Sequence, residues 1–249
     1  MAQDYWNEVY SEFKPYELDP AVFRATTDLP AQRLIEAIGE VAGKEVLEIG
    51  CGDGRLSVYF AKLGGRVTAI DNSLAAVESA RALAAVNGVS SSVQVYHLDA
   101  MELNQLGRSF DLVFGKFILH HLEPFEQFCE ALSGVIKPGG QGTFYENNAG
   151  NPILIFSRAF LAGRFGIPKY GDQEEYPFEP KEVAMLQRRF DRVCQLFPEF
   201  VFFRLLGSYL FRKSQRWYRL FEWLDGWVLH YWSGIHKYSY HQIVGIQKY

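Results

Sequence analysis

Between residues 45 and 146, short apolar runs alternate with segments whose apolar side chains recur every three or four positions. The short runs predict strands at residues 45–49, 66–70, 93–97, 110–115 and 142–146. The longer segments predict helices, as in residues 56–63, where the apolar spacing is i, i+3, i+4 and i+7. Strands that alternate with helices require crossover connections, and this predicts a doubly wound α/β fold around a parallel sheet.

Beyond residue 146 the pattern becomes irregular. Pro180 opens a predicted helix whose apolar positions run through Phe197, and Pro198 ends it. Residues 200–206 and 238–247 are predicted to be strands, with a helical insertion between them. Long insertions in such folds usually lie over the carboxyl ends of the strands, where ligands bind.

Composition narrows the classes of function. The 249 residues include 25 Lys+Arg and 29 Asp+Glu, a net charge of −4, which disfavours a nucleic-acid partner. No 18-residue stretch lacks a charged side chain, so no membrane-spanning helix is expected. The three cysteines are far apart in the sequence, so we expect neither a disulfide framework nor a metal site. This cysteine usage favours a reducing compartment, and we therefore expect a cytoplasmic protein.

The segment Glu48–Gly54 joins the first predicted strand to the first helix and reads Glu-Ile-Gly-Cys-Gly-Asp-Gly. Glycines allow a tight turn and a close approach of ligand to backbone, and the helix N-terminus behind them favours negative groups. A dinucleotide-binding fingerprint requires a further glycine at position 55, which is Arg55. A nicotinamide cofactor is therefore disfavoured.

Acidic residues follow the next two strands. Asp71 closes the second strand, where a carboxylate accepts hydrogen bonds from ribose hydroxyls in this topology. Asp99 follows the third strand, ahead of Ala100 and Met101, and there an acid can accept an adenine amino hydrogen while the methionine flanks the ring. The fourth strand ends at Gly115 beside the same crevice.

Over residues 40–147 the sequence resembles the class I S-adenosylmethionine-dependent methyltransferases, in particular the small-molecule branch that includes quinone methyltransferases. The resemblance rests on the glycine turn, Asp71, Asp99-Ala100, His120-His121-Leu122 and Lys137-Pro138-Gly139-Gly140. It implies a Rossmann-like seven-stranded sheet whose last strand is antiparallel, with helical insertions that form a cap. The corresponding segments are a cap at 1–40, a core at 41–147, a lid and helix at 148–199, and strands six and seven at 200–249 around an aromatic insertion at 207–236.

The resemblance also assigns the cofactor site. Gly50, Gly52 and Gly54 would lie along the methionine part of S-adenosylmethionine, and Asp71 would hold the ribose. The remaining residues expected at the cofactor are Asp99, Ala100, Met101, Asn72, Glu48, Cys51 and Gly115.

The chemistry requires an acceptor in line with the S–CH3 bond and, for a hydroxyl or an acidic carbon, a base. His121, His120 and Glu146 follow the fourth and fifth strands and are the candidates. The two histidines could instead simply join a turn to the next helix. Enzymes of this superfamily that methylate nucleic-acid bases or glutamine amides usually carry an Asn-Pro-Pro-Tyr-like motif after the fourth strand. This chain has Gly115-Lys116-Phe117-Ile118 there, which disfavours a nucleic-acid or amide substrate.

Two aromatic segments flank this core. The helix predicted around residues 209–232 is amphipathic and rich in tryptophan, and it could pack on the sheet or on a second subunit, line a substrate pocket, or lie on a membrane. Residues 4–10 are too aromatic for a free tail, and we expect them to close the active site.

Together these features predict a methyltransferase for a small, lipophilic or aromatic metabolite, with oxygen as the first-choice acceptor, then carbon or nitrogen. The alternatives are an NAD(P)-dependent oxidoreductase and a non-catalytic S-adenosylmethionine-binding regulatory protein.

Overall fold

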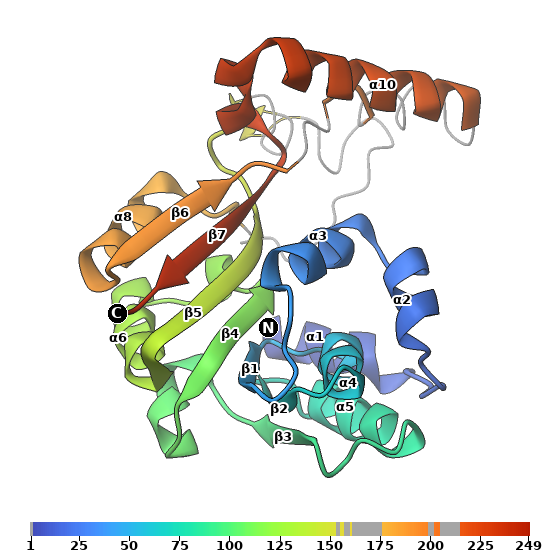
Figure 1. Ribbon diagram of the computed structural model, residues 1–249, viewed down its shortest axis with the longest axis vertical. Coiled ribbons are helices and arrows are strands. Elements are labelled where there is room, and N and C mark those ends of the chain that lie inside the picture. Colours follow the sequence, from blue (N-terminus) through green and yellow to red (C-terminus); the bar gives the residue numbers. More distant parts are fainter. Residues whose placement is uncertain (1, 153–154, 157–159, 161–175, 199–201, 205–214) are drawn as a thin grey trace.

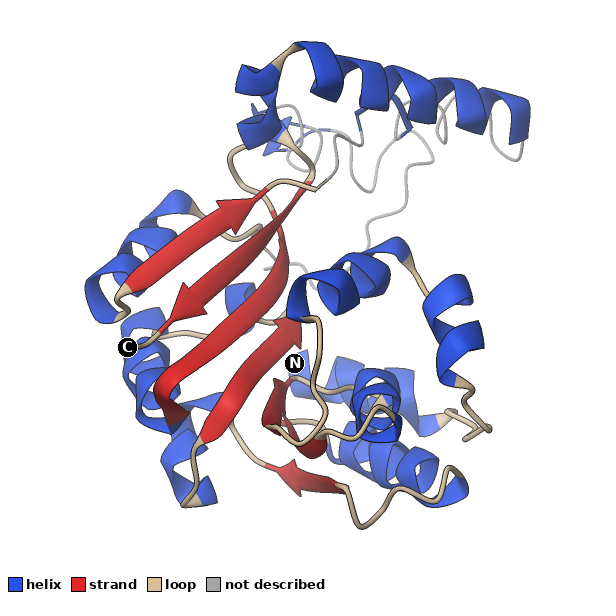
Figure 2. Ribbon diagram, viewed as in Figure 1, coloured by secondary structure: helices blue, strands red, loops and turns tan. Residues whose placement is uncertain are grey.

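A seven-stranded sheet in the order β3-β2-β1-β4-β5-β7-β6 forms the centre of the computed structural model (Figures 1 and 2). The structure describes residues 2–152, 155–156, 160, 176–198, 202–204 and 215–249. The strands are β1 (Glu45–Ile49), β2 (Arg66–Asp71), β3 (Val93–His97), β4 (Phe110–Lys116), β5 (Ile136–Asn147), β6 (Arg192–Leu196) and β7 (His241–Gln247). β1 to β5 are parallel, whereas β7 is antiparallel to both β5 and β6. The predicted doubly wound sheet with an antiparallel last strand is confirmed.

The helices complete three layers around this sheet. They are α1 (Ala2–Ser11), α2 (Pro20–Thr26), α3 (Leu29–Ile38), α4 (Arg55–Lys62), α5 (Leu74–Val86), α6 (Phe125–Val135), α8 (Pro180–Arg189) and α10 (Gln215–Tyr231), with short 3-10 turns η1 (Ala100–Leu106), η2 (Leu119–His121) and η3 (Ser233–Tyr238). None of the helices in the described ranges is long and apolar enough to cross a membrane.

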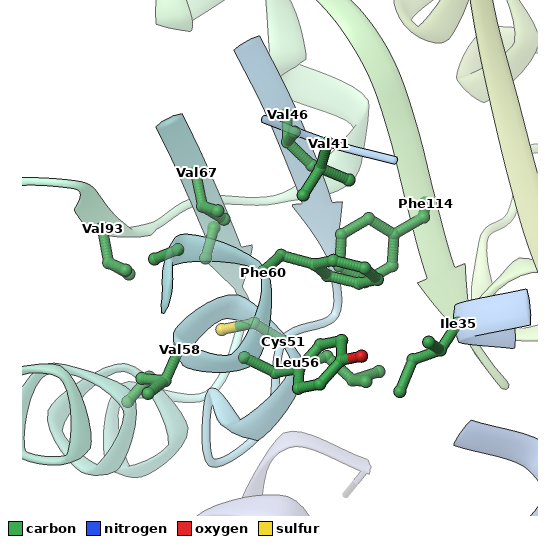
Figure 3. Packing of buried hydrophobic residues seen from close by; sticks show 14 of the residues in the cluster. Ile35, Val41, Val46, Cys51, Leu56, Val58, Phe60, Val67, Val93 and Phe114 are labelled. Carbon is green, nitrogen blue, oxygen red and sulfur yellow. The ribbon is translucent and has the colours of Figure 1, made fainter. Parts of the chain in front are cut away.

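Two hydrophobic cores lie on opposite faces of the sheet, because successive strand residues point to opposite sides. On one face Val46 and Phe114 pack beneath α3, α4 and α5, and Figure 3 shows Phe60 of α4 next to Phe114, with a ring-centroid distance of 5.1 Å. On the other face Leu47 and Val113 pack against α6 and α8.

The prediction of strand six at residues 200–206 is wrong. β6 is Arg192–Leu196, and residues 202–204 have helical backbone, while the rest of that segment lies outside the described residues. The helix predicted from Pro180 through Phe197 ends at Arg189. Phe190 already has extended backbone, with φ −113° and ψ 146°, and the next residues pair antiparallel with β7. Strand pairing therefore replaces the helix that the apolar spacing alone favours.

The strand predicted at residues 142–146 begins earlier, at Ile136, and its pairing with β4 carries an irregularity between Phe110 and Leu112. Residues 137–140 form this irregular part of β5. In Figure 1 α10 lies beyond the carboxyl end of β5, apart from the helices that cover the sheet.

Candidate functional site

A pocket of about 400 Å³ opens at the carboxyl ends of the parallel strands. Residues from the ends of β1, β2 and β4, from the loop after β3, and from α1 line it. This is the edge at which open α/β sheets bind ligands. The lining residues are Trp6, Tyr10, Ile49, Gly50, Ile70, Asp71, Asn72, Ser73, Leu98, Asp99, Ala100, Met101, Lys116, Phe117, Ile118, His121, Leu122 and Glu123.

The glycine turn reaches the pocket through Gly50. Gly50, Gly52 and Gly54 have φ of 70°, 54° and 76°, in the left-handed region that side chains disfavour. A Cβ at Gly50 would lie 2.7 Å from Ile118 Cδ1, and one at Gly54 would lie 2.6 Å from Ala80 Cβ. The turn therefore lies against Ile118, just before η2, and against Ala80 of α5. Side chains at positions 50 and 54 would collide with these residues, which explains why glycine is required there.

Asp71 connects this turn to the start of α5. Its Oδ2 accepts a hydrogen bond from Gly52 N at 2.9 Å, and its Oδ1 accepts one from Ser73 N at 2.9 Å. Burial raises the pKa of Asp71, and the backbone N–H donors partly oppose this shift. A carboxylate has about four acceptor positions, so Asp71 can still accept bonds from a ligand in the pocket.

The loop after β3 supplies the opposite wall. Asp99 caps η1 by accepting a bond from Met101 N at 2.8 Å through Oδ1. Asn72 O lies 3.1 Å from His97 Nε2, which holds the loops after β2 and β3 together. Ala100 and Met101 add apolar surface next to Asp99. An acidic group beside apolar side chains suits a base with an exocyclic amino group.

Five residues predicted at the cofactor do not line the pocket: Glu48, Cys51, Gly52, Gly54 and Gly115. Glu48 is buried and accepts a hydrogen bond from the Ser57 hydroxyl; burial raises its pKa to about 8. Cys51 is also buried, and its pKa is raised well above the usual value by the same cause. Figure 3 shows its side chain among the core residues near Leu56. Glu48 and Cys51 are thus packed in the core, and contact of any of the five residues with a cofactor stays a prediction.

Glu146, His120 and His121 lie next to one another. Glu146 is fully buried at the end of β5, and its Oε1 accepts bonds from Ile118 N at 2.8 Å and Leu119 N at 2.7 Å. Its Oε2 lies 2.6 Å from His120 Nδ1. The His120 ring is 4.1 Å from the His121 ring, and of the two only His121 lines the pocket. Glu146 thus fixes the turn that presents His121.

Helix α1 covers the pocket. Asn7 Oδ1 accepts bonds from Ser73 Oγ at 2.7 Å and from Ala75 N at 3.4 Å, which docks α1 on the N-terminus of α5. Trp6 stands edge-on to His121 with ring centroids 6.3 Å apart. Burial, with Asp71 and Asp53 adding to it, raises the pKa of Tyr10, so this residue lines the pocket as a neutral phenol.

Sequence reasoning missed Lys116 and Phe117 as pocket residues. Phe117 has φ 55°, which is uncommon for a bulky side chain, and its ring packs on Tyr145 with centroids 5.5 Å apart. Lys116 ends β4, and its Nζ is 3.0 Å from Asp28 Oδ2. The available signal was a lysine directly after Gly115, where the sequence predicted the fourth strand to end. In the described part of the chain, no three His, Cys, Asp or Glu side chains are grouped to hold a metal.

Comparison with known proteins gives one family match. Residues 46–140 match the family described as "Methyltransferase domain". This range contains the glycine turn, both strand-end aspartates and the two histidines.

Several curated relatives are ubiquinone biosynthesis O-methyltransferases. The chain is 38% identical over 100 residues to "Ubiquinone biosynthesis O-methyltransferase, mitochondrial" of Schizosaccharomyces pombe, covering 40% of this chain and 36% of that protein. It is 27% identical over 187 residues to "Ubiquinone biosynthesis O-methyltransferase" of Bordetella avium, covering 74% and 73%. A protein of the same name from Xanthomonas euvesicatoria is 37% identical over 148 residues, covering 58% and 61%. The chain therefore spans less than two thirds of two of these three relatives.

Solved structures share the fold over nearly the whole chain. Geranyl diphosphate C-methyltransferase from Streptomyces coelicolor A3(2) superposes with a TM-score of 0.59 at 13% identity, covering 99% of this chain and 95% of that one. N-methyltransferase NodS from Bradyrhizobium japonicum WM9 gives 0.57 at 14% identity, covering 99% and 98%. The fold outside residues 46–140 thus has counterparts too.

Proposed function

We propose that this chain is a class I S-adenosylmethionine-dependent methyltransferase that transfers the methyl group of S-adenosylmethionine to a small, lipophilic or aromatic metabolite; the match of residues 46–140 to the methyltransferase domain family supports this. Oxygen is the first-choice acceptor atom, and carbon or nitrogen the next. The observation that carries the proposal is the pocket itself, in which a glycine turn, two strand-end aspartates and a histidine meet at one edge of the sheet.

In this proposal each part of the cofactor has its own contact. Gly50 lies beside the methionine chain, Asp71 accepts bonds from the ribose hydroxyls, and Asp99 accepts one from the adenine amino group. Ala100, Met101 and Asn72 flank the adenine. The free acceptor positions of Asp71 and the apolar wall beside Asp99 support these assignments.

His121 is the proposed base for a hydroxyl acceptor. It takes the hydroxyl proton while the oxygen attacks the methyl carbon; the S–CH3 bond breaks, its electron pair stays on sulfur, and S-adenosylhomocysteine leaves. Its place in the pocket lining favours it over His120, whose side chain is only 4% exposed and contacts Glu146. Glu146 and His120 act as positioning residues in this proposal.

Oxygen ranks first because the curated relatives carry the name O-methyltransferase. Apolar side chains, among them Met101 and Ile118, also form much of the pocket lining. Positive charge disappears from sulfur during transfer, and a water-poor site favours that change.

Transfer of a radiolabelled methyl group from S-adenosylmethionine into a metabolite extract, followed by mass spectrometry of the labelled product, tests the proposal. We expect a labelled lipophilic product with the wild type. His121→Gln should lower kcat by about 10²- to 10⁴-fold, the usual contribution of a general base. His236→Gln is the control, because His236 lies in η3, its ring bonds Leu229 O of α10, and it does not line the pocket. Binding of S-adenosylhomocysteine without any transfer would instead indicate the regulatory protein.

For partners, we propose a peripheral contact between α10 and a membrane, the source of a lipophilic acceptor. Leu220, Trp223, Trp227 and Tyr231 are spaced along one side of α10 and are 42–63% exposed. Arg216 and Arg219 are exposed beside them. An exposed aromatic stripe with adjacent cations is typical of helices that lie in the lipid headgroup region.

Co-sedimentation with phosphatidylcholine vesicles, with and without an anionic phospholipid, tests this contact. We expect Trp223→Glu with Trp227→Glu to abolish sedimentation, whereas Val22→Glu, at an equally exposed apolar position on α2, should not. Concentration-dependent dimerisation lost in the same double variant, without vesicle binding, would assign the stripe to a homodimer instead.

We further propose a cytoplasmic location. Its support is that Cys51, Cys129 and Cys194 are all free thiols, as a reducing compartment maintains them. Fractionation of the source cells tests it, and recovery of the protein from an oxidising compartment would contradict it.

A further inference from the structure

We propose that Lys116 binds the α-carboxylate of the cofactor's amino-acid part, with Asp28 positioning its ammonium group. This inference rests on the proposed function and adds the residue that recognises the amino-acid end of the cofactor. It follows from the order of the strand ends and from the charges of the lining.

The order of the strands is the same as the order of the cofactor's parts. The sheet runs β3-β2-β1-β4, and the ends of these strands carry Asp99, Asp71, Gly50 and Lys116 respectively. Adenine at Asp99, ribose at Asp71 and the sulfur-bearing chain at Gly50 place the amino-acid end at the next strand, β4. Adjacent strands are about 4.8 Å apart, so an extended ligand reaches each end in turn.

The charges of the pocket agree with this placement. Three carboxyl groups line it, those of Asp71, Asp99 and Glu123. Among the described lining residues, Lys116 is the one with a permanent positive charge. An anionic carboxylate brought into a pocket with three acids needs a cationic partner, and an ammonium group is a suitable one.

Asp28 orients the Lys116 side chain and leaves its ammonium group able to bind a ligand. Asp28 caps α3, because its Oδ1 accepts a bond from Ala31 N at 2.8 Å, while its Oδ2 contacts Lys116 Nζ at 3.0 Å. Burial acts to raise the pKa of Asp28, but the Lys116 ammonium and the Ala31 N–H outweigh it and lower the pKa. An ammonium group has three donors, so two remain for a ligand.

The placement also separates the amino-acid end from the acceptor. Lys116 extends toward α3, whereas His121 lies in the turn that leads to α6 on the other side of the sheet. A cofactor held by Lys116 therefore leaves the His121 side of the pocket open for the methyl acceptor.

Two ligands that differ only in the amino-acid part test the inference. S-adenosylhomocysteine carries the carboxylate, whereas 5′-methylthioadenosine lacks the whole amino-acid group. By calorimetric titration, Lys116→Met should raise the Kd for S-adenosylhomocysteine about 10- to 30-fold, the effect of one charge-assisted hydrogen bond. The Kd for 5′-methylthioadenosine should stay within about twofold, which also shows that the variant is folded. Lys116→Arg should restore most of the lost affinity.

Lys137→Met is the matched control. Lys137 also makes a single ion pair, with Asp111 at 2.9 Å, but at the opposite edge of the sheet, where β5 begins. It should leave both Kd values unchanged. Equal weakening of both ligands by Lys116→Met, or no weakening of either, would overturn the inference. Failure of both ligands to bind the wild type would instead overturn the proposed function.

Discussion

Glu48 is an acidic residue enclosed in the core at the end of β1. Its side chain is 3% exposed and is bonded to the Ser57 hydroxyl of α4. Burial is the main cause that raises its pKa to about 8, and the charges of Asp53 and Asp71 add to it. The carboxyl group is therefore mostly protonated at neutral pH in the folded protein, whereas in the unfolded chain it is ionised.

This difference predicts a pH-dependent stability. Between the ordinary pKa of about 4.3 and the folded value of about 8, the folded state binds one more proton than the unfolded state. The free energy of unfolding should therefore fall as the pH rises through this window, by at most about 1.4 kcal/mol per unit from this residue. Glu48→Gln removes the effect, so in urea unfolding the variant should gain stability over the wild type as pH rises from 5 to 8.

Glu78→Gln is the control, because Glu78 is exposed on α5. It should keep the wild-type slope. If Glu48→Gln and the wild type show the same pH dependence of unfolding, Glu48 is not neutral in the folded protein and its assignment as a buried acid is wrong.

Among single residues, the sequence predicted those whose place in the site depends only on the neighbouring strand. The glycines of the turn and the strand-end residues Asp71 and Asp99 were recognisable from spacing, because each follows a strand directly. The pairing of Lys116 with Asp28 was not, since the two residues are 88 positions apart. The contact of His120 with Glu146 likewise depends on how β4 and β5 pair.

Among the elements, α1 connects the N-terminus to the pocket. Trp6 and Tyr10 line the pocket, and Asn7 bonds the first turn of α5. The same helix packs along α5, where Ser79 Oγ donates a hydrogen bond to Tyr10 O at 3.2 Å, while Tyr5, Glu8 and Val9 are exposed. The docking of α1 therefore depends on the side that carries Trp6, Asn7 and Tyr10.

Deletion of residues 1–14 is expected to abolish turnover, because the pocket loses one wall and admits water.

Asn7→Ala should weaken S-adenosylhomocysteine binding several-fold through loss of the bonds to Ser73 and Ala75. Glu8→Ala, on the exposed side of the same helix, should not. Calorimetry and methyl-transfer assays measure both effects, and full activity of the deletion variant would refute the role of α1.

The misplaced sixth strand shows where apolar spacing misleads. Val183, Leu186 and Phe190 are buried, and Val193 continues their helical spacing into β6. β6 is an edge strand whose residues are largely exposed, so it lacks the alternation that marks a half-buried strand. Its partner, β7, is about 50 residues away in the sequence. Pairing with a distant strand cannot be read from local pattern.

For the whole molecule, the C-terminal part completes a sheet that the N-terminal part begins. β7 covers the edge of β5, and Lys248 Nζ donates to Ser133 O at 2.6 Å and Ile136 O at 3.1 Å at the end of α6. The sequence after β5 carries no motif, which is why the fold and the cofactor site could be predicted in greater detail than the acceptor.

Calorimetric titration of the whole protein with S-adenosylhomocysteine and, separately, with NADH tests the central claim most directly. We predict saturable one-site binding of S-adenosylhomocysteine, lost in Asp71→Ala, and no heat of binding with NADH. Binding of NADH in place of S-adenosylhomocysteine, or no binding of either compound, would contradict the account.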